Sequence, residues 1–286
     1  MLDIDEFECW IRTFHEIFER SEGYYDAYPL TTSWIQQWLD SSTFIVQSKD
    51  IERLNNLMRN LDYGVFGVIE QEAEKIKAQF ETMIEEYLKI GEVENVGFAL
   101  APYLFVWNFQ RFKKYFREKP EFKLDEYFKE LGNFLKQKKQ EIKYFQNKKL
   151  VKDEIERDKI AGLFSDLNDK LRELGIRKNE QRENEPIGTI KILHAFSPYY
   201  FPLIDNAIAK TFGLIRNWET LNLTHYLRWM DYIKQWLSKY DQKMIEKLEK
   251  DCQRSILKLV DQALYIMCSV DLRKRIKKII HGCQQS

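Results

Sequence analysis

The chain has 286 residues, of which 44% are hydrophobic and 31% charged, so it is not an intrinsically disordered protein and has room for one large or two smaller domains. Lys and Arg number 45, as do Asp and Glu, so no global positive charge indicates nucleic-acid binding, although a local basic patch is compatible with this balance. No apolar run approaches the ~20 residues of a membrane span, and the acidic start at residues 1–8 lacks the apolar core of a signal peptide. We therefore expect a soluble, cytoplasmic protein without a membrane partner.

The predicted elements are helical. The chain contains six Pro and 11 Gly, few for its length, and apolar residues recur every three or four positions. We expect an all-α, multi-helix globular fold, either as a single domain over residues 1–286 or as two helical lobes, about 1–175 and 186–286, with a cleft between them. In chain order, helices are expected over about residues 3–20, 32–39, 48–61, 68–91, 92–116, 124–150, 155–174, 190–196, 205–212, 221–237, 241–264 and 272–280.

Two features of the first half interrupt this pattern. The segment Ser42–Gln47 is a weak strand candidate. The helix expected after Glu92 is apolar nearly all round, which predicts a central buried helix that Pro102 kinks or restarts. Asn108 follows this apolar run and needs polar partners if it is buried, so it either bonds a neighbouring helix or lines a pocket.

The segment Leu124–Leu150 is the most basic in the chain. Its later face carries lysines with two interleaved aromatic residues, Tyr144 and Phe145. Such a run is usually a solvated face, but cations interleaved with aromatic rings can also contact a phosphate backbone and stack on bases. The basic helix expected at 272–280 has the same two interpretations, a packed terminal helix or an arm for nucleic acid or membrane.

The four cysteines are not arranged as a metal site. Cys9, Cys252, Cys268 and Cys283 form no CxxC pair, and no histidine lies at ligand spacing from them. We expect no metal and no cofactor. Buried thiols in a reducing compartment are the preferred interpretation, with a disulfide as the alternative.

The stretch Pro186–Gly213 carries the strongest candidate for chemistry. It follows the polar run Arg177–Glu185, which predicts a linker or loop, and it predicts two short helices joined by a proline-rich segment. Its only carboxylate, Asp205, follows the apolar run Phe201–Ile204 and opens the second helix. Asp205 is therefore either an N-cap of that helix or a functional carboxylate. His194, on the first helix, is more typical of a packed residue than of a catalytic one.

This stretch resembles the helix-hairpin-helix DNA glycosylase superfamily. Pro186–Gly188 is similar to a reduced form of that family's hairpin, 190–196 to the helix that follows it, and Asp205 stands at the position of the catalytic aspartate, with Ile208 as the matching apolar residue. The resemblance covers about thirty residues. It lacks the family's full hairpin sequence, its four-cysteine loop and its lysine nucleophile, which would fall near Ile187 or Gly188, whereas Lys191 lies about one helical turn away.

The resemblance implies a monofunctional glycosylase that acts on double-stranded DNA. The residues that it implies for DNA contact are Ile187, Gly188, Thr189, Lys191 and Lys210. A flipped base would enter a pocket for which Trp107, Asn108, Phe109 and Gln110 are the candidates, and Asp205 would stabilise positive charge on the sugar or orient a water. Two alternatives remain: a nucleic-acid-binding protein of this fold without the chemistry, and a helical interaction scaffold in which Asp205 only caps its helix.

Overall fold

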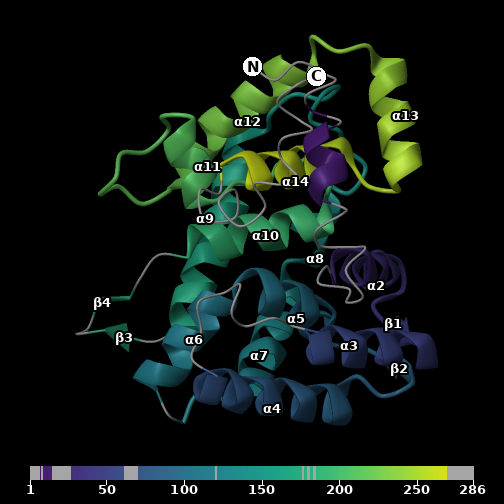
Figure 1. The fold of residues 1–286 in the computed structure, drawn as a ribbon, viewed down its shortest axis with the longest axis vertical. Coiled ribbons are helices and arrows are strands. Elements are labelled where there is room, and N and C mark those ends of the chain that lie inside the picture. The colour runs from purple at the N-terminus through teal and green to yellow at the C-terminus, as the bar shows by residue number, and fades with distance from the viewer. Residues whose placement is uncertain are drawn as a thin grey trace. The chain divides into compact units, whose positions relative to one another are not determined.

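The computed structural model describes residues 7, 9–14, 27–60, 70–119, 121–175, 177–178, 181–182 and 185–268 (Figure 1). Helices dominate these residues, together with two small antiparallel sheets of two strands each. The expected all-α, multi-helix class is confirmed. Within the same ranges, no helix is both long enough and apolar enough to cross a membrane.

The elements divide the chain as follows. The helices are α2 (Tyr28–Ser41), α3 (Ser48–Asn60), α4 (Glu70–Tyr87), α5 (Val96–Trp107), α6 (Phe109–Glu118), α7 (Leu124–Gln137), α8 (Lys139–Lys143), α9 (Arg157–Leu174), α10 (Pro186–Phe196), α11 (Asn206–Thr211), α12 (Leu223–Leu237), α13 (Gln242–Cys252) and α14 (Ile256–Cys268). The strands are β1 (Phe44–Val46), β2 (Gly91–Val93), β3 (Arg177–Lys178) and β4 (Gln181–Arg182).

The chain forms two compact units, and neither is a continuous segment. Unit 1 contains Met1–Ile17, Tyr144–Ser165 and Ser197–Ser286, and unit 2 contains Phe18–Lys143 and Asp166–Phe196. One boundary falls within α9 and another directly after α10. The stretch Pro186–Gly213 is therefore shared between the two units.

Unit 2 is built around α5. Every residue of this helix from Val96 to Val106 is buried, which confirms the expected central helix, and α5 packs against α2, α7 and α10. Its approach to α7 requires glycine on both sides. A Cβ on Gly97 would lie 1.8 Å from the carbonyl oxygen of Phe128, and a Cβ on Gly132 would lie 1.7 Å from Oδ1 of Asn95.

The interruption of this helix lies at Asn108. The helix continues through Pro102 and ends at Trp107, and a separate helix begins at Phe109. The Asn108 N–H donates to the carbonyl of Leu104 at 2.8 Å and closes the last turn of α5. Expecting one helix over residues 92–116 was therefore wrong, because the chain turns at Asn108.

Three other helix boundaries also differ from expectation. α2 begins at Tyr28 with a proline in its first turn, so its start is set by proline's fixed φ and not by a cap at residue 32 or 33. The basic helix expected over residues 124–150 is broken at Lys138 into α7 and α8. The helix expected over 241–264 is two helices, because Gln253 adopts a left-handed conformation (φ 52°) that ends α13.

The weak strand candidate is confirmed as β1. It pairs antiparallel with β2, and Phe44 lies opposite Val93. The burial of Phe44 and Val46 alternates with the exposure of Ile45, as expected for a strand with one covered face. The polar run Arg177–Glu185, expected as a loop, contains the two-residue strands of a small hairpin, β3 and β4.

Unit 1 has its core on α12 and α14. The buried residues of α12 recur every three or four positions, and half of them are aromatic: Tyr226, Trp229, Met230, Ile233, Trp236 and Leu237. α14 is buried along most of its length and packs against α11 and α13. The described residues of the expected first helix, Phe7 and 9–14, are helical, and the ring of Phe7 contacts that of Trp236. The basic tail expected as a helix at 272–280 lies outside the described residues.

The cysteines differ from expectation at one position. Cys9 is disulfide-bonded, whereas Cys252 and Cys268 form no disulfide and Cys283 lies outside the described residues. The expectation of reduced thiols is therefore wrong for Cys9. In the described part of the chain, no cluster of three or more His, Cys, Asp or Glu side chains is placed to hold a metal ion.

Candidate functional site

The segment immediately before Asp205 is held in place by burial and by hydrogen bonds from α12. Phe201 to Ile204 are buried, and two aromatic side chains of α12 bond to this backbone. The Tyr226 hydroxyl donates to the carbonyl of Pro202 at 3.1 Å, and Nε1 of Trp229 donates to that of Leu203 at 2.9 Å. These bonds satisfy carbonyls that no helix or strand uses, and they fix the position at which Asp205 follows.

Asp205 is the N-cap of α11. Its backbone is extended (φ −117°, ψ 179°), and its Oδ1 accepts a hydrogen bond from the N–H of Ile208 at 2.8 Å. The side chain is half-buried. A negative charge at the start of a helix is stabilised by the unpaired N–H groups there. The carboxylate is therefore oriented by its own helix.

The negative charge of Asp205 affects a side chain of α14. Burial raises the pKa of the Tyr265 phenol to about 12, with the charge of Asp205 as the next cause. Tyr265 also makes an edge contact with Phe14 at 6.5 Å between ring centroids. Asp205 thus lies near an aromatic group that stays protonated at neutral pH and can act as a hydrogen-bond donor.

The residues predicted for DNA contact are divided between the two units. Ile187, Gly188 and Thr189 form the first turn of α10 in unit 2, and Thr189 is buried with its hydroxyl donating to the carbonyl of Glu185 at 3.0 Å. Nζ of Lys191 donates to the carbonyl of Trp107. Lys210 lies in unit 1, exposed in the last turn of α11. These five residues therefore do not form one cluster within either unit.

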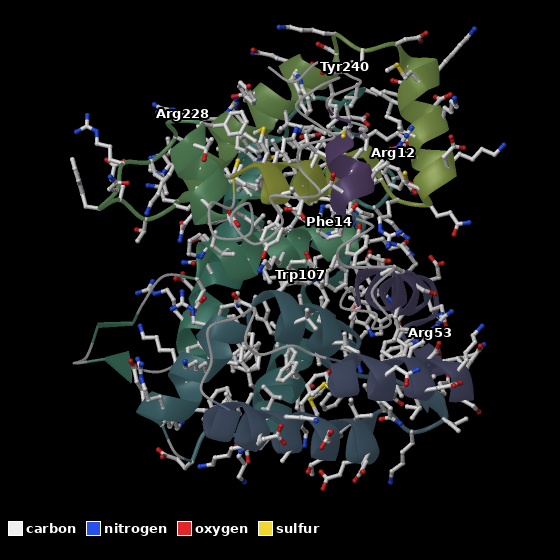
Figure 2. The ribbon with its side chains drawn as sticks, in the orientation of Figure 1. Arg12, Phe14, Arg53, Trp107, Arg228 and Tyr240 are labelled. Carbon is white, nitrogen blue, oxygen red and sulfur yellow. The ribbon has the colours of Figure 1, made fainter. Side chains whose placement is uncertain are left out.

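The predicted pocket residues lie in unit 2 at the turn between α5 and α6. Trp107, labelled in Figure 2, is half-buried, and Phe109 is buried with its ring against Phe105 at 5.4 Å. The amide nitrogen of Asn108 would lie 3.7 Å from a Cβ placed on Gly188, so this asparagine faces α10. The side chain of Gln110 lies outside the described part of the structure. The structure thus brings Trp107 and Asn108 beside the first half of α10.

A second carboxylate, Glu185, lies where α6 and the start of α10 meet. It was not identified from the sequence. The Glu185 side chain is 5% exposed and immediately precedes α10. It accepts from Nε of Arg111 at 2.9 Å and from the Tyr115 hydroxyl at 2.5 Å. Its N–H donates to Oδ1 of Asn168 at 2.9 Å. Glu185 thus connects α6, α9 and α10.

The electrostatics of this cluster follow from burial. Burial raises the pKa of Tyr115 well above its usual range, with Tyr127 and Glu185 as further causes. Burial also raises the pKa of Tyr127, again with Glu185 contributing. Both phenols therefore remain protonated as donors. Glu185 is the last residue of a polar run, so no periodic pattern of apolar residues indicates its burial. The one signal in the sequence is that it directly precedes a proline at the start of a helix.

His194 is also buried, and its Nε2 lies 3.0 Å from the Tyr28 hydroxyl in unit 2. This contact agrees with the expectation of a packed histidine.

The lysines of the basic segment make internal contacts. Lys138 pairs with Asp166 at 2.6 Å. Lys139 donates to the carbonyl of Trp38 at 2.7 Å and lies over its ring, and Lys143 donates to the carbonyl of Leu39 at 3.3 Å. Burial lowers the pKa of Lys139, with Lys143 as a further cause. Lys139 and Lys143 thus satisfy carbonyls at the end of α2, where a positive charge is favourable.

The chain was compared with protein-family models, with curated proteins and with solved structures, and none of the three comparisons found a match.

Proposed function

We propose that the protein is a helix-hairpin-helix DNA glycosylase-like protein that releases damaged bases through Asp205, without a lysine nucleophile. The observation that supports this proposal is the fixed geometry of Asp205. Two side chains of α12 hold the segment before it, and the N–H of Ile208 orients its carboxylate. An ionised carboxylate with a set orientation can stabilise the positive charge that develops on a sugar as its base departs.

The mechanism follows from this placement. A base turned out of the duplex presents its sugar to the carboxylate, and Asp205 stabilises the developing cation or orients the attacking water. Because no lysine stands at the position that the resemblance assigns to a nucleophile, the product is an abasic sugar in an intact strand.

The test is base release from a panel of duplexes, each with one damaged or mismatched base. Wild-type protein is expected to release base from at least one duplex, and Asp205→Asn to lose that activity. Asn is as good an N-cap as Asp, so the variant separates lost chemistry from lost folding. Release of no base by the wild type, or equal release by Asp205→Asn, would disprove the proposal.

A second candidate function is a helical interaction scaffold. The N-cap contact of Asp205 favours it, since capping alone accounts for an aspartate at this position. The internal contacts of Lys138, Lys139 and Lys143 favour it as well, because lysines that cap or pair within the fold contribute less to a phosphate-binding surface. A protein that binds no nucleic acid at low ionic strength would support this candidate over the first.

A further inference from the structure

The loop between α11 and α12 carries the most exposed large apolar side chain among the described residues. Trp218 is 77% exposed, whereas the tryptophans of the cores, such as Trp34 and Trp229, are at most 1% exposed. The loop extends away from the helices of unit 1 (Figure 1). Leaving a tryptophan in water forgoes a large gain from burial, so this position calls for an explanation beyond folding.

The conformation of the loop exposes the Trp218 ring to solvent. The N–H of Arg216 donates to Oε2 of Glu219 at 2.8 Å, and the N–H of Glu219 donates to the carbonyl of Arg216 at 3.1 Å. These two bonds close a tight turn with Trp218 on it. The Arg216 guanidinium lies 5.8 Å from the centre of the Trp218 ring. The turn therefore displays an aromatic face and a cation together.

The segment that contains this turn has more cations than carboxylates. Between Asn206 and Arg228 the charged residues are Lys210, Arg216, Glu219 and Arg228, and the one carboxylate among them is bonded to the turn backbone. Arg228, labelled in Figure 2, is exposed on α12, and Lys210 is exposed on α11. Cations thus flank the turn on both adjoining helices.

This chemistry favours one class of partner. An aromatic ring beside cations suits single-stranded nucleic acid, in which a base stacks on the ring while the phosphates meet the positive charges. A membrane surface would require several apolar anchors, but residues 216–220 are all exposed and Trp218 is the only apolar one. A protein hot spot would be surrounded by further apolar contacts, which these polar neighbours do not provide.

We propose that the loop between α11 and α12 binds single-stranded or locally unpaired nucleic acid, with an unpaired base stacked on Trp218 and the adjacent phosphate paired with Arg216. This inference rests on the proposed function insofar as both take nucleic acid as the partner. It differs in assigning the recognition of unpaired bases to Trp218, away from the carboxylate chemistry of Asp205.

The test is fluorescence anisotropy with a labelled oligothymidine of about 20 nucleotides and with a labelled hairpin duplex, at low and high salt. Wild-type protein is expected to bind the oligothymidine with quenching of tryptophan fluorescence. Trp218→Ala should weaken this binding about tenfold, as expected for the loss of one stacked base, and Trp218→Phe should retain part of it. Arg216→Gln should reduce the salt dependence.

Tyr144→Ala is the matched control. Tyr144 is also exposed, but its hydroxyl is bonded to Glu156 and Lys159 lies 3.7 Å from its ring centre, so it has no open face to offer and its removal should leave binding unchanged. Equal affinity of Trp218→Ala and wild type for the oligothymidine would overturn this inference alone. Absence of binding to the oligothymidine would also overturn this inference, whereas the proposed function is judged separately, by base release from the lesion-bearing duplexes. Trp218-dependent binding to anionic phospholipid vesicles without oligonucleotide binding would assign the loop to a membrane surface.

Discussion

The two units expose different kinds of apolar side chain. In unit 1 the exposed large apolar residues among those described are Tyr144, Tyr199 and Trp218, and each has a cation within 6 Å of its ring centre. In unit 2 they are aliphatic, Ile45 and Ile90. Of these rings, that of Trp218 beside Arg216 is the one proposed to meet a flat, anionic partner, which aliphatic side chains such as Ile45 and Ile90 do not favour. The difference assigns the proposed nucleic-acid contact to unit 1.

The exposed apolar side chains of unit 2 include one, Ile90, that borders a hollow. The chemistry of this hollow differs from that of the turn around Trp218. Ile90 lines an open space of about 520 Å³ where α3 begins and α4 ends. Its other lining residues are mostly aliphatic or acidic: Ile51, Asn55, Glu81, Ile84, Glu85, Leu88 and Lys89. Carboxylates at this rim would repel a phosphate backbone. The rim of this hollow is therefore unfavourable for a polyanion, in contrast to the surface proposed for Trp218.

The largest expected effect concerns the glycines of unit 2. Gly97→Ala places a Cβ 1.8 Å from the Phe128 carbonyl oxygen, so the backbones of α5 and α7 must separate. We expect a loss of about 3 kcal/mol or more in the free energy of unfolding, measured by urea denaturation. The control is Gly162→Ala in α9, where nothing lies within 4 Å of the new Cβ. That variant should gain about 1 kcal/mol. Similar values for both would contradict the close packing of α5 on α7.

The next effect concerns the disulfide of Cys9. Reduction should lower the free energy of unfolding by about 2–4 kcal/mol, because the cross-link limits the unfolded chain. Cys9 is disulfide-bonded, whereas Cys252 and Cys268 form no disulfide, so thiol titration of the unfolded protein should find fewer thiols before reduction than after it. Cys252→Ser serves as the control and should leave the effect of reduction unchanged. Four reactive thiols before reduction would contradict the disulfide.

Substitution of one carboxylate in each unit is expected to change the free energy of unfolding by different amounts. Glu185→Gln in unit 2 leaves Arg111 without its charged partner in a largely buried site, and we expect a loss of about 2 kcal/mol in unfolding free energy. Asp205→Asn in unit 1 keeps an N-cap and should change this free energy by less than about 0.5 kcal/mol. A double-mutant cycle with Arg111→Met measures the Glu185 pair itself. A coupling energy near zero would show that the pair contributes nothing to stability.

The sequence predicted the helical class and the central helix α5, because a long apolar run with few turn residues leaves few other structures. It also located Asp205 at a helix start. It could not predict the break at Asn108 or the left-handed Gln253, because each depends on how neighbouring helices pack and not on local propensity. Glu185 was missed for the same reason, since its burial follows from partners on α6 and α9 that are distant in sequence.

The smallest effect is a pH dependence at the surface of unit 1. The Glu156 carboxylate accepts from the Tyr144 hydroxyl and from Lys148, and these bonds lower the pKa of Glu156 to about 2. A carboxyl whose folded pKa lies below its unfolded value stabilises the fold above the unfolded pKa, near 4.5. That stabilisation is lost as pH falls from there toward 2.

The Tyr144→Phe variant tests which contact causes this shift. Removal of the hydroxyl takes away the largest cause, so the Glu156 pKa should rise toward 4.5 in an NMR titration of the side-chain carboxyl. Lys159→Gln is the comparison, since Lys159 acts on Glu156 mainly through its charge, and it should raise the pKa by less. If Lys159→Gln raised the Glu156 pKa more than Tyr144→Phe did, the charge of Lys159, and not the hydrogen bond from Tyr144, would be the main cause of the low pKa.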